Sequence, residues 1–136
     1  MNMSVQWNEY GELIEKLGSK IIASGKKYTG VYGVPRGGMI VAVGISHILD
    51  IPVVCHVVQA TKRTLIVDDI SDSGGTLSQY NISDSDTATL FIDPNTKYIP
   101  TYYVIKNVDK IWINFPYEIL GTHDHVSKVK NQYEEV

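Results

Sequence analysis

Residues 65–76 read LIVDDISDSGGT, which places three carboxylates between an apolar run and a glycine turn. The run up to Asp68 is almost continuously apolar, and this is typical of a strand covered on both faces in a parallel sheet. In strand geometry Asp68 and Asp69 project to opposite faces, so we expect the two carboxylates to have different partners. The stretch therefore predicts a buried parallel strand that ends in a functional turn.

The rest of the chain repeats this order of strand and helix. Apolar positions near helical spacing predict one or two helices over 4–23 and another over 38–50. Apolar and β-branched runs predict strands over 29–34, 53–58, 64–70, 87–92, 101–108 and 111–118, and a short helix follows over 74–82. We therefore expect a single domain over residues 1–136 with an α/β fold, in which an open, mostly parallel twisted sheet has helices on both faces.

The charge, cysteine content and hydropathy of the chain make several classes of protein less favoured candidates for it. The chain has 136 residues and a formal net charge of −3, so no general basic surface favours nucleic-acid binding. Cys55 is the single cysteine, which excludes an internal disulfide and suits a reducing cytosol. The N-terminus lacks a signal-peptide pattern, and the apolar stretch at 39–45 is far shorter than the ~20 residues of a membrane span. We expect a cytoplasmic protein that does not bind membranes.

A second strand-to-helix turn, GVPRGG at 33–38, has features of an anion site. Gly37 and Gly38 allow close approach of the backbone to a ligand, the following helix presents unpaired N–H groups, and Arg36 adds a planar set of donors. A plain turn with a solvated arginine is the alternative interpretation. Ligands of open α/β sheets bind at the carboxyl ends of the strands, where both turns are expected.

The loop at 71–76 combines hydroxyl groups with glycine amides and suits a phosphate monoester. Three carboxylates do not suit an anion, so they must face something else, such as ribose hydroxyls or a magnesium ion. The alternative is that Asp72 or Ser73 merely caps the helix and that the strand-end carboxylates are solvated. Capping would explain one side chain only, so we favour the ligand site.

With both turns in view, the sequence resembles the type I phosphoribosyltransferases. LIVDDISDSGGT is similar to that family's signature for phosphoribosyl pyrophosphate (PRPP), and GVPRGG is similar to its pyrophosphate loop. TATLFIDP and IWINFPYE resemble the C-terminal segment of the small xanthine, hypoxanthine and guanine enzymes. The likeness covers residues 29–118 and implies a type I phosphoribosyltransferase-like sheet with a small C-terminal hood segment.

The resemblance implies roles for the two turns. Arg36 and Gly37 would meet the pyrophosphate, and the family often has a cis peptide bond at the position of Pro35–Arg36. Asp68 and Asp69 would lie near the ribose hydroxyls, with Asp69 also binding magnesium. Asp72 would approach the purine as the catalytic carboxylate. The 5′-phosphate would be held by Ser71, Asp72, Ser73, Gly74, Gly75 and Thr76.

The resemblance also implies a base site. Trp112 would stack on the base, the Ile113 backbone would read its edge, and Glu118 would reach a second magnesium ion. Family purine enzymes carry a lysine that contacts the 6-oxo group, but this chain has Asp93 at that position. Lys97 is the candidate substitute, and the carboxylate of Asp93 would favour an amino group on the base.

A second departure concerns closure of the site. Family members usually have a long mobile loop between the second and third core strands, whereas only residues 59–63 separate the two runs here. Lys62 and Arg63 in that connection could touch pyrophosphate, but solvation is the favoured interpretation. In the polar tail, His123 and His125 are also interpreted as solvated rather than as metal ligands.

The residues and the resemblance together predict an enzyme that uses Mg²⁺ and transfers the phosphoribosyl group of PRPP to a purine, with a 6-oxopurine favoured. The alternative is a non-catalytic regulator that binds PRPP or a nucleotide on the same fold. A pyrimidine acceptor is a third option, which the Trp112 segment disfavours. Relatives of this fold commonly dimerise, so we expect a homodimer.

Overall fold

The computed structural model describes residues 2–118, which form two compact units. The larger unit contains residues 11–110, and the smaller one contains residues 2–10 and 111–118 of the described chain. None of the helices in the described chain has the length and apolar character needed to cross a membrane. The prediction of a single domain over 1–136 stays a prediction.

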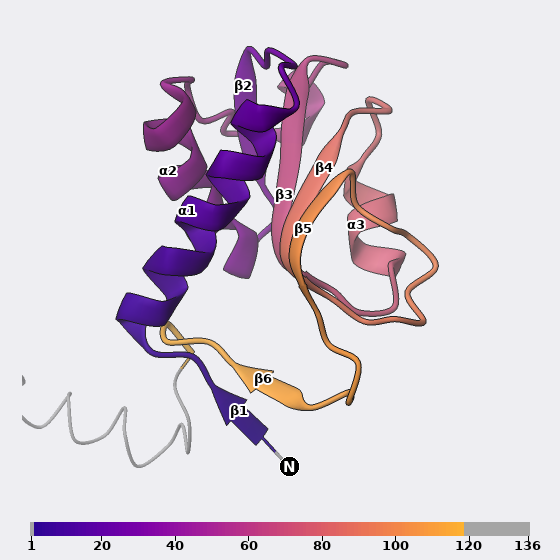
Figure 1. Ribbon diagram of the computed structural model, residues 1–136. Helices are drawn as coiled ribbons and strands as arrows, with labels where there is room; N and C mark the ends of the chain where they lie inside the picture. The colour runs from indigo at the N-terminus through magenta and orange to yellow at the C-terminus, as the bar shows by residue number, and fades with distance from the viewer. Residues whose placement is uncertain (1, 119–136) are drawn as a thin grey trace, which may run out of the picture. The chain divides into compact units, whose positions relative to one another are not determined.

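A four-stranded parallel sheet forms the centre of the larger unit (Figure 1). Its strands are β2 (Gly30–Gly33), β3 (Thr64–Ser71), β4 (Thr87–Ile92) and β5 (Tyr102–Lys106), in the order β2-β3-β4-β5. Every residue of β2 and β4 is buried, as are the first five of β3, which matches their continuous apolar sequences. These strands were predicted from the sequence within one or two residues.

Helices cover both faces of this sheet (Figure 1). Helix α2 (Gly37–Leu49) packs beside residues 11–23 of α1 (Trp7–Ala23), where Gly44 lies against Ile14. Helix α3 (Gly75–Tyr80) covers the other face, and its Leu77 belongs to a buried cluster with Tyr32, Val34 and Ile66. The predicted fold class is therefore confirmed.

The predicted strand over 53–58 is wrong. Only Val53 forms a bridge, to Val31, and the Val54 N–H donates to the Val31 carbonyl before the chain turns into the 3₁₀ helix η1 (Val57–Gln59). The run is β-branched, but much of it is exposed, so it has no apolar covering that would favour a longer strand. Instead, Val57 and Ala60 pack against the buried cluster beside α3.

The smaller unit has its own two-stranded parallel sheet of β1 (Asn2–Ser4) and β6 (Trp112–Asn114). Strand β1 was not predicted, because three exposed residues carry no hydrophobic pattern. The Val5 N–H extends the pairing by donating to the Asn114 carbonyl. Aromatic contacts of Tyr10 with Phe115 and Tyr117 complete this unit.

The turn between β2 and α2 requires glycine at position 33. A Cβ added there would lie 2.3 Å from the Gly38 carbonyl oxygen and 2.7 Å from the Met39 Cα, which are backbone atoms that cannot rotate away. Gly11 in α1 provides a contrast, because a Cβ there meets nothing within 4 Å. The turn is therefore held tightly closed by backbone packing.

We predict that Gly33→Ala lowers the free energy of unfolding by ~1–3 kcal/mol, as expected for overpacking of a closely packed site. Gly11→Ala is the matched control and should leave stability unchanged or raise it by up to ~1 kcal/mol, since alanine favours helix. Urea denaturation of both variants measures the difference. Equal stability of the two variants would contradict the tight turn.

Candidate functional site

The two turns predicted to bind phosphate both lie at the carboxyl edge of the sheet. Gly33 pairs with Val67 in the β2–β3 register, and the Val34 N–H donates to the Val67 carbonyl at 2.9 Å. A Cβ on Gly38 would lie 2.5 Å from that carbonyl oxygen and 3.3 Å from Oδ1 of Asp68. The start of α2 is therefore in close contact with the acidic end of β3.

The first turn has the backbone of an anion site. The Pro35–Arg36 peptide bond is cis, as the resemblance implied for this position. Arg36 is exposed and directly precedes α2, and its side chain makes no capping hydrogen bond. The first amides of a helix lack partners within the helix, and the helix dipole makes this end positive. The Gly38 and Met39 N–H groups already donate to the Val34 and Arg36 carbonyls, so the donors that can meet an anion together are the guanidinium and the Gly37 amide.

The second turn begins where β3 ends at Ser71. The Ser71 side chain is buried, and its hydroxyl donates to the Tyr98 carbonyl at 2.8 Å and contacts the hydroxyl of Thr96. Gly74 has a φ of 92°, which glycine adopts easily, and it directly precedes α3. The exposed part of the turn consists of Asp72, Ser73, Gly75 and Thr76, so hydroxyls and backbone amides form its outer rim.

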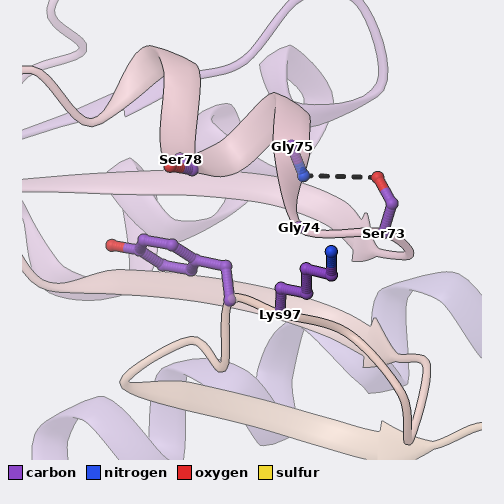
Figure 2. Close-up of a pocket in the computed structure, with 6 residues that line it drawn as sticks. Ser73, Gly74, Gly75, Ser78 and Lys97 are labelled. Atoms are coloured by element: carbon purple, nitrogen blue, oxygen red, sulfur yellow. Dashed lines mark hydrogen bonds between the residues drawn. The ribbon is translucent and has the colours of Figure 1, made fainter.

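The Gly75 amide of this rim already binds an acceptor, which is the hydroxyl of Ser73. The Ser73 hydroxyl oxygen accepts the Gly75 N–H at 3.2 Å, which closes the turn locally (Figure 2). A phosphate oxygen is a stronger acceptor than a neutral hydroxyl, because hydrogen bonds to ionised groups are roughly twice as strong. An incoming phosphate can therefore replace this internal contact.

Asp68 and Asp69 form an interacting carboxyl pair. Asp68 is only 8% exposed, and this burial, together with the charge of Asp69 and a hydrogen bond to it, raises the pKa of Asp68 to about 8. The two carboxyl groups therefore interact at the end of β3, although successive side chains of a strand start toward opposite faces; that they have different partners stays a prediction. The Asp69 N–H donates to Asp68 Oδ1, which favours the charged carboxylate and opposes this rise in the pKa of Asp68, and the Ile70 N–H donates to Asp69 Oδ1.

Backbone hydrogen bonds join the loop after β4 to the second turn. The Asp93 N–H donates to the Ser71 carbonyl at 2.9 Å, and the Lys97 N–H donates to the Ser73 carbonyl at 3.1 Å. Asp93 Oδ1 accepts the Asn95 N–H, so this carboxylate stabilises its own turn. These contacts could not be predicted from local sequence, because they join residues more than twenty positions apart.

A cavity of about 410 Å³ lies between the second turn and this loop. It is lined by Ser73, Gly74, Gly75, Ser78, Lys97 and Tyr98 (Figure 2). Ser78 and Tyr98 were not among the predicted site residues, although Ser78 could have been proposed from its place one turn into the helix that follows the glycines. The cavity brings two hydroxyl-bearing residues of the turn and helix together with a lysine.

The connection before β3 lies at the other end of the strands. The Thr29 N–H donates to the Arg63 carbonyl, and the register pairs Gly30 with Thr64, which are the first residues of β2 and β3. Lys62 and Arg63 therefore lie at the amino edge of the sheet, away from both turns. This favours the interpretation that these two cations are solvated.

The remaining predicted residues belong to the smaller unit. The Trp112 side chain is 65% exposed, whereas Ile113 is buried and pairs with Met3 in the β1–β6 ladder. Glu118 is exposed, and its Oε1 accepts the Phe115 N–H. Across residues 2–118, no three His, Cys, Asp or Glu side chains converge as a metal site. His123 and His125 lie outside the described residues.

Comparison of the fold with solved structures finds close matches. A purine phosphoribosyltransferase from Pyrococcus horikoshii Ot3 has a TM-score of 0.74 and 29% identity, covering 87% of this chain and 95% of that one. A xanthine-guanine-hypoxanthine phosphoribosyltransferase from Helicobacter pylori has a TM-score of 0.72 and 18% identity, covering 96% and 99%. The predicted likeness to this enzyme fold is confirmed.

A third match carries no named activity. It is a hypothetical protein from Neisseria gonorrhoeae with bound ppGpp, at a TM-score of 0.72 and 21% identity, covering 97% of this chain and 98% of that one. No family model matches the sequence, and no curated protein matches it. The likeness to known proteins therefore rests on the shared fold.

Proposed function

We propose that this chain, which has the type I phosphoribosyltransferase fold, transfers the phosphoribosyl group of PRPP to a purine base and releases pyrophosphate. The observation that carries the proposal is that the 33–38 turn packs against Val67 and Asp68 of β3, the strand that ends in the 71–76 turn at the same sheet edge. PRPP carries a phosphate at one end of its ribose and a pyrophosphate at the other. Two adjacent anion-binding turns with a carboxyl pair between them match that distribution of groups.

In this proposal each turn holds one end of PRPP. Arg36 and the Gly37 amide at the start of α2 bind the pyrophosphate, while Ser73, Gly74, Gly75 and Thr76 hold the 5′-phosphate. Ser71 supports this turn through its hydroxyl contacts with the 93–98 loop. Asp68 and Asp69 accept hydrogen bonds from the two ribose hydroxyls, which offsets the cost of placing two carboxylates together.

The carboxyl pair also fits a magnesium ion. Mg²⁺ prefers oxygen ligands, and protein sites often supply only one or two carboxylates while substrate phosphates complete the shell. Asp69 would hold such an ion, with Glu118 the candidate for a second. Bound Mg²⁺ would neutralise charge on the leaving pyrophosphate.

The reaction needs no covalent nucleophile from the protein. The bond between C1 of ribose and the pyrophosphate oxygen breaks, and the pyrophosphate leaves with the electron pair. A nitrogen of the base forms the new bond to C1 and gives up a proton, for which Asp72 is the proposed acceptor. The chain contributes by aligning both reactants and by stabilising the departing charge.

A 6-oxopurine is the favoured acceptor within this proposal. Trp112 has an exposed indole ring that can stack on a purine, and the Ile113 backbone is proposed to read the edge of the base. Asp93 accepts the Asn95 N–H through Oδ1, and its second carboxylate oxygen stays the candidate contact for an amino group on the base. The homodimer expected from the sequence is retained as a proposal.

The direct test combines the protein with PRPP, Mg²⁺ and a panel of purines and pyrimidines. Chromatography of the products should show a nucleoside monophosphate with at least one 6-oxopurine. If PRPP binds but no base yields a nucleotide, the second candidate function holds, namely a regulator that binds PRPP or a nucleotide. The Neisseria neighbour with bound ppGpp favours that candidate, as does the packing of the 54–63 connection against the sheet.

We predict that Asp72→Asn lowers kcat by roughly 10²- to 10⁴-fold, the usual contribution of a general base, and changes PRPP affinity much less. Asp50→Asn is the matched control, because Asp50 is exposed at the far end of α2 and asparagine tolerates its left-handed backbone. Steady-state kinetics with both variants measures the contrast. An Asp72→Asn enzyme with full turnover would remove the proposed role.

A further inference from the structure

The turn that is proposed to hold the 5′-phosphate contains no cation of its own. Residues 71–76 read SDSGGT, so they offer amides and hydroxyls but also the negative charge of Asp72. A phosphate monoester carries up to two negative charges and is usually matched by a lysine or an arginine. A positive charge from another segment would therefore strengthen phosphate binding at this turn.

Lys97 occupies the place from which such a charge can act. It lines the same cavity as Ser73, Gly74 and Gly75, and Figure 2 shows its ammonium group directed toward the turn that these residues form. Within residues 2–118 the Lys97 ammonium has no hydrogen bond or ion pair. Asp72 is not among the residues that line the cavity. The charge of Lys97 is thus available to a ligand.

The backbone around Lys97 is fixed relative to the turn. Its N–H donates to the Ser73 carbonyl, and the neighbouring Tyr98 carbonyl accepts the Ser71 hydroxyl. The Tyr98 ring packs against the buried cluster, and its hydroxyl accepts a hydrogen bond from Asn81 Nδ2 at 2.7 Å. Gly74 allows this approach, because a Cβ there would lie 2.6 Å from the Tyr98 nitrogen.

We infer that Lys97 binds the phosphate monoester of the substrate, rather than the purine that the sequence suggested for it. The inference rests on the proposed function, since it names the cation of the 5′-phosphate subsite. Ser78 adds a hydroxyl to the same subsite. The cavity volume of about 410 Å³ lies within the usual range of small-molecule pockets.

The test uses ribose 5-phosphate, which has the monoester but neither a base nor a pyrophosphate. In calorimetric titrations at low salt, Lys97→Met should bind ribose 5-phosphate about tenfold more weakly than the unchanged protein, as expected for loss of one charge-assisted hydrogen bond. Lys97→Arg keeps the charge and should retain most of the affinity. Lys62→Met removes the same charge at the opposite edge of the sheet and should have no effect.

Unchanged ribose 5-phosphate affinity in Lys97→Met would overturn the inference, and weaker purine binding in that variant would return Lys97 to the base. The test separates this inference from the proposed reaction, because it does not measure turnover. A protein that makes no nucleotide but shows the Lys97 effect keeps the phosphate subsite and loses the enzyme function. An unchanged protein that does not bind ribose 5-phosphate contradicts both.

Discussion

The parallel pairing of β2 with β3 is the interaction on which the candidate site depends. Four residues of β2 pair in register with Thr64 to Val67, and all eight are buried. Because the strands are parallel, both carboxyl ends reach the same edge, so the 33–38 and 71–76 turns become neighbours. The apolar sequence that makes these strands buried also determines where their polar turns meet.

The carboxyl edge of the sheet carries both acidic and basic side chains. Burial and the nearby Asp69 favour the protonated form of Asp68, so the carboxyl pair is costly without a cation or hydroxyl donors. Arg36 lies on one side of the pair in the first turn, and Lys97 belongs to the loop fastened to the second turn. A ligand with anionic groups at both ends and hydroxyls between them offsets each of these charges. PRPP has that arrangement.

The connection that precedes β3 is longer than the sequence predicted, because the 53–58 run forms only an isolated bridge at Val53. In the structure, residues 54–63 form a longer connection that includes η1 and packs beside α3. Val57, Ala60 and Tyr98 share one apolar cluster, so this connection supports the segment that carries Lys97. The connection therefore packs against the same cluster as Tyr98, the neighbour of the proposed phosphate ligand Lys97.

The sequence predicted those elements whose structure depends mainly on residues that are close together in the chain. Continuous apolar runs located β3 and β4, and the glycine turns located the starts of α2 and α3. The 53–58 run was misread, because β-branched residues indicate a strand only where burial supports them. The place of Lys97 could not be predicted, since it depends on hydrogen bonds between the loop after β4 and the turn after β3.

Amide hydrogen exchange with and without PRPP and Mg²⁺ tests the central claim most directly, because it reports on both turns in one experiment. The account predicts that amides at 36–39 and 73–77 gain protection together, while the connection at 61–63 on the opposite edge does not change. Protection of only one turn, or of neither at PRPP concentrations that saturate binding, would contradict a single PRPP site formed by the two turns.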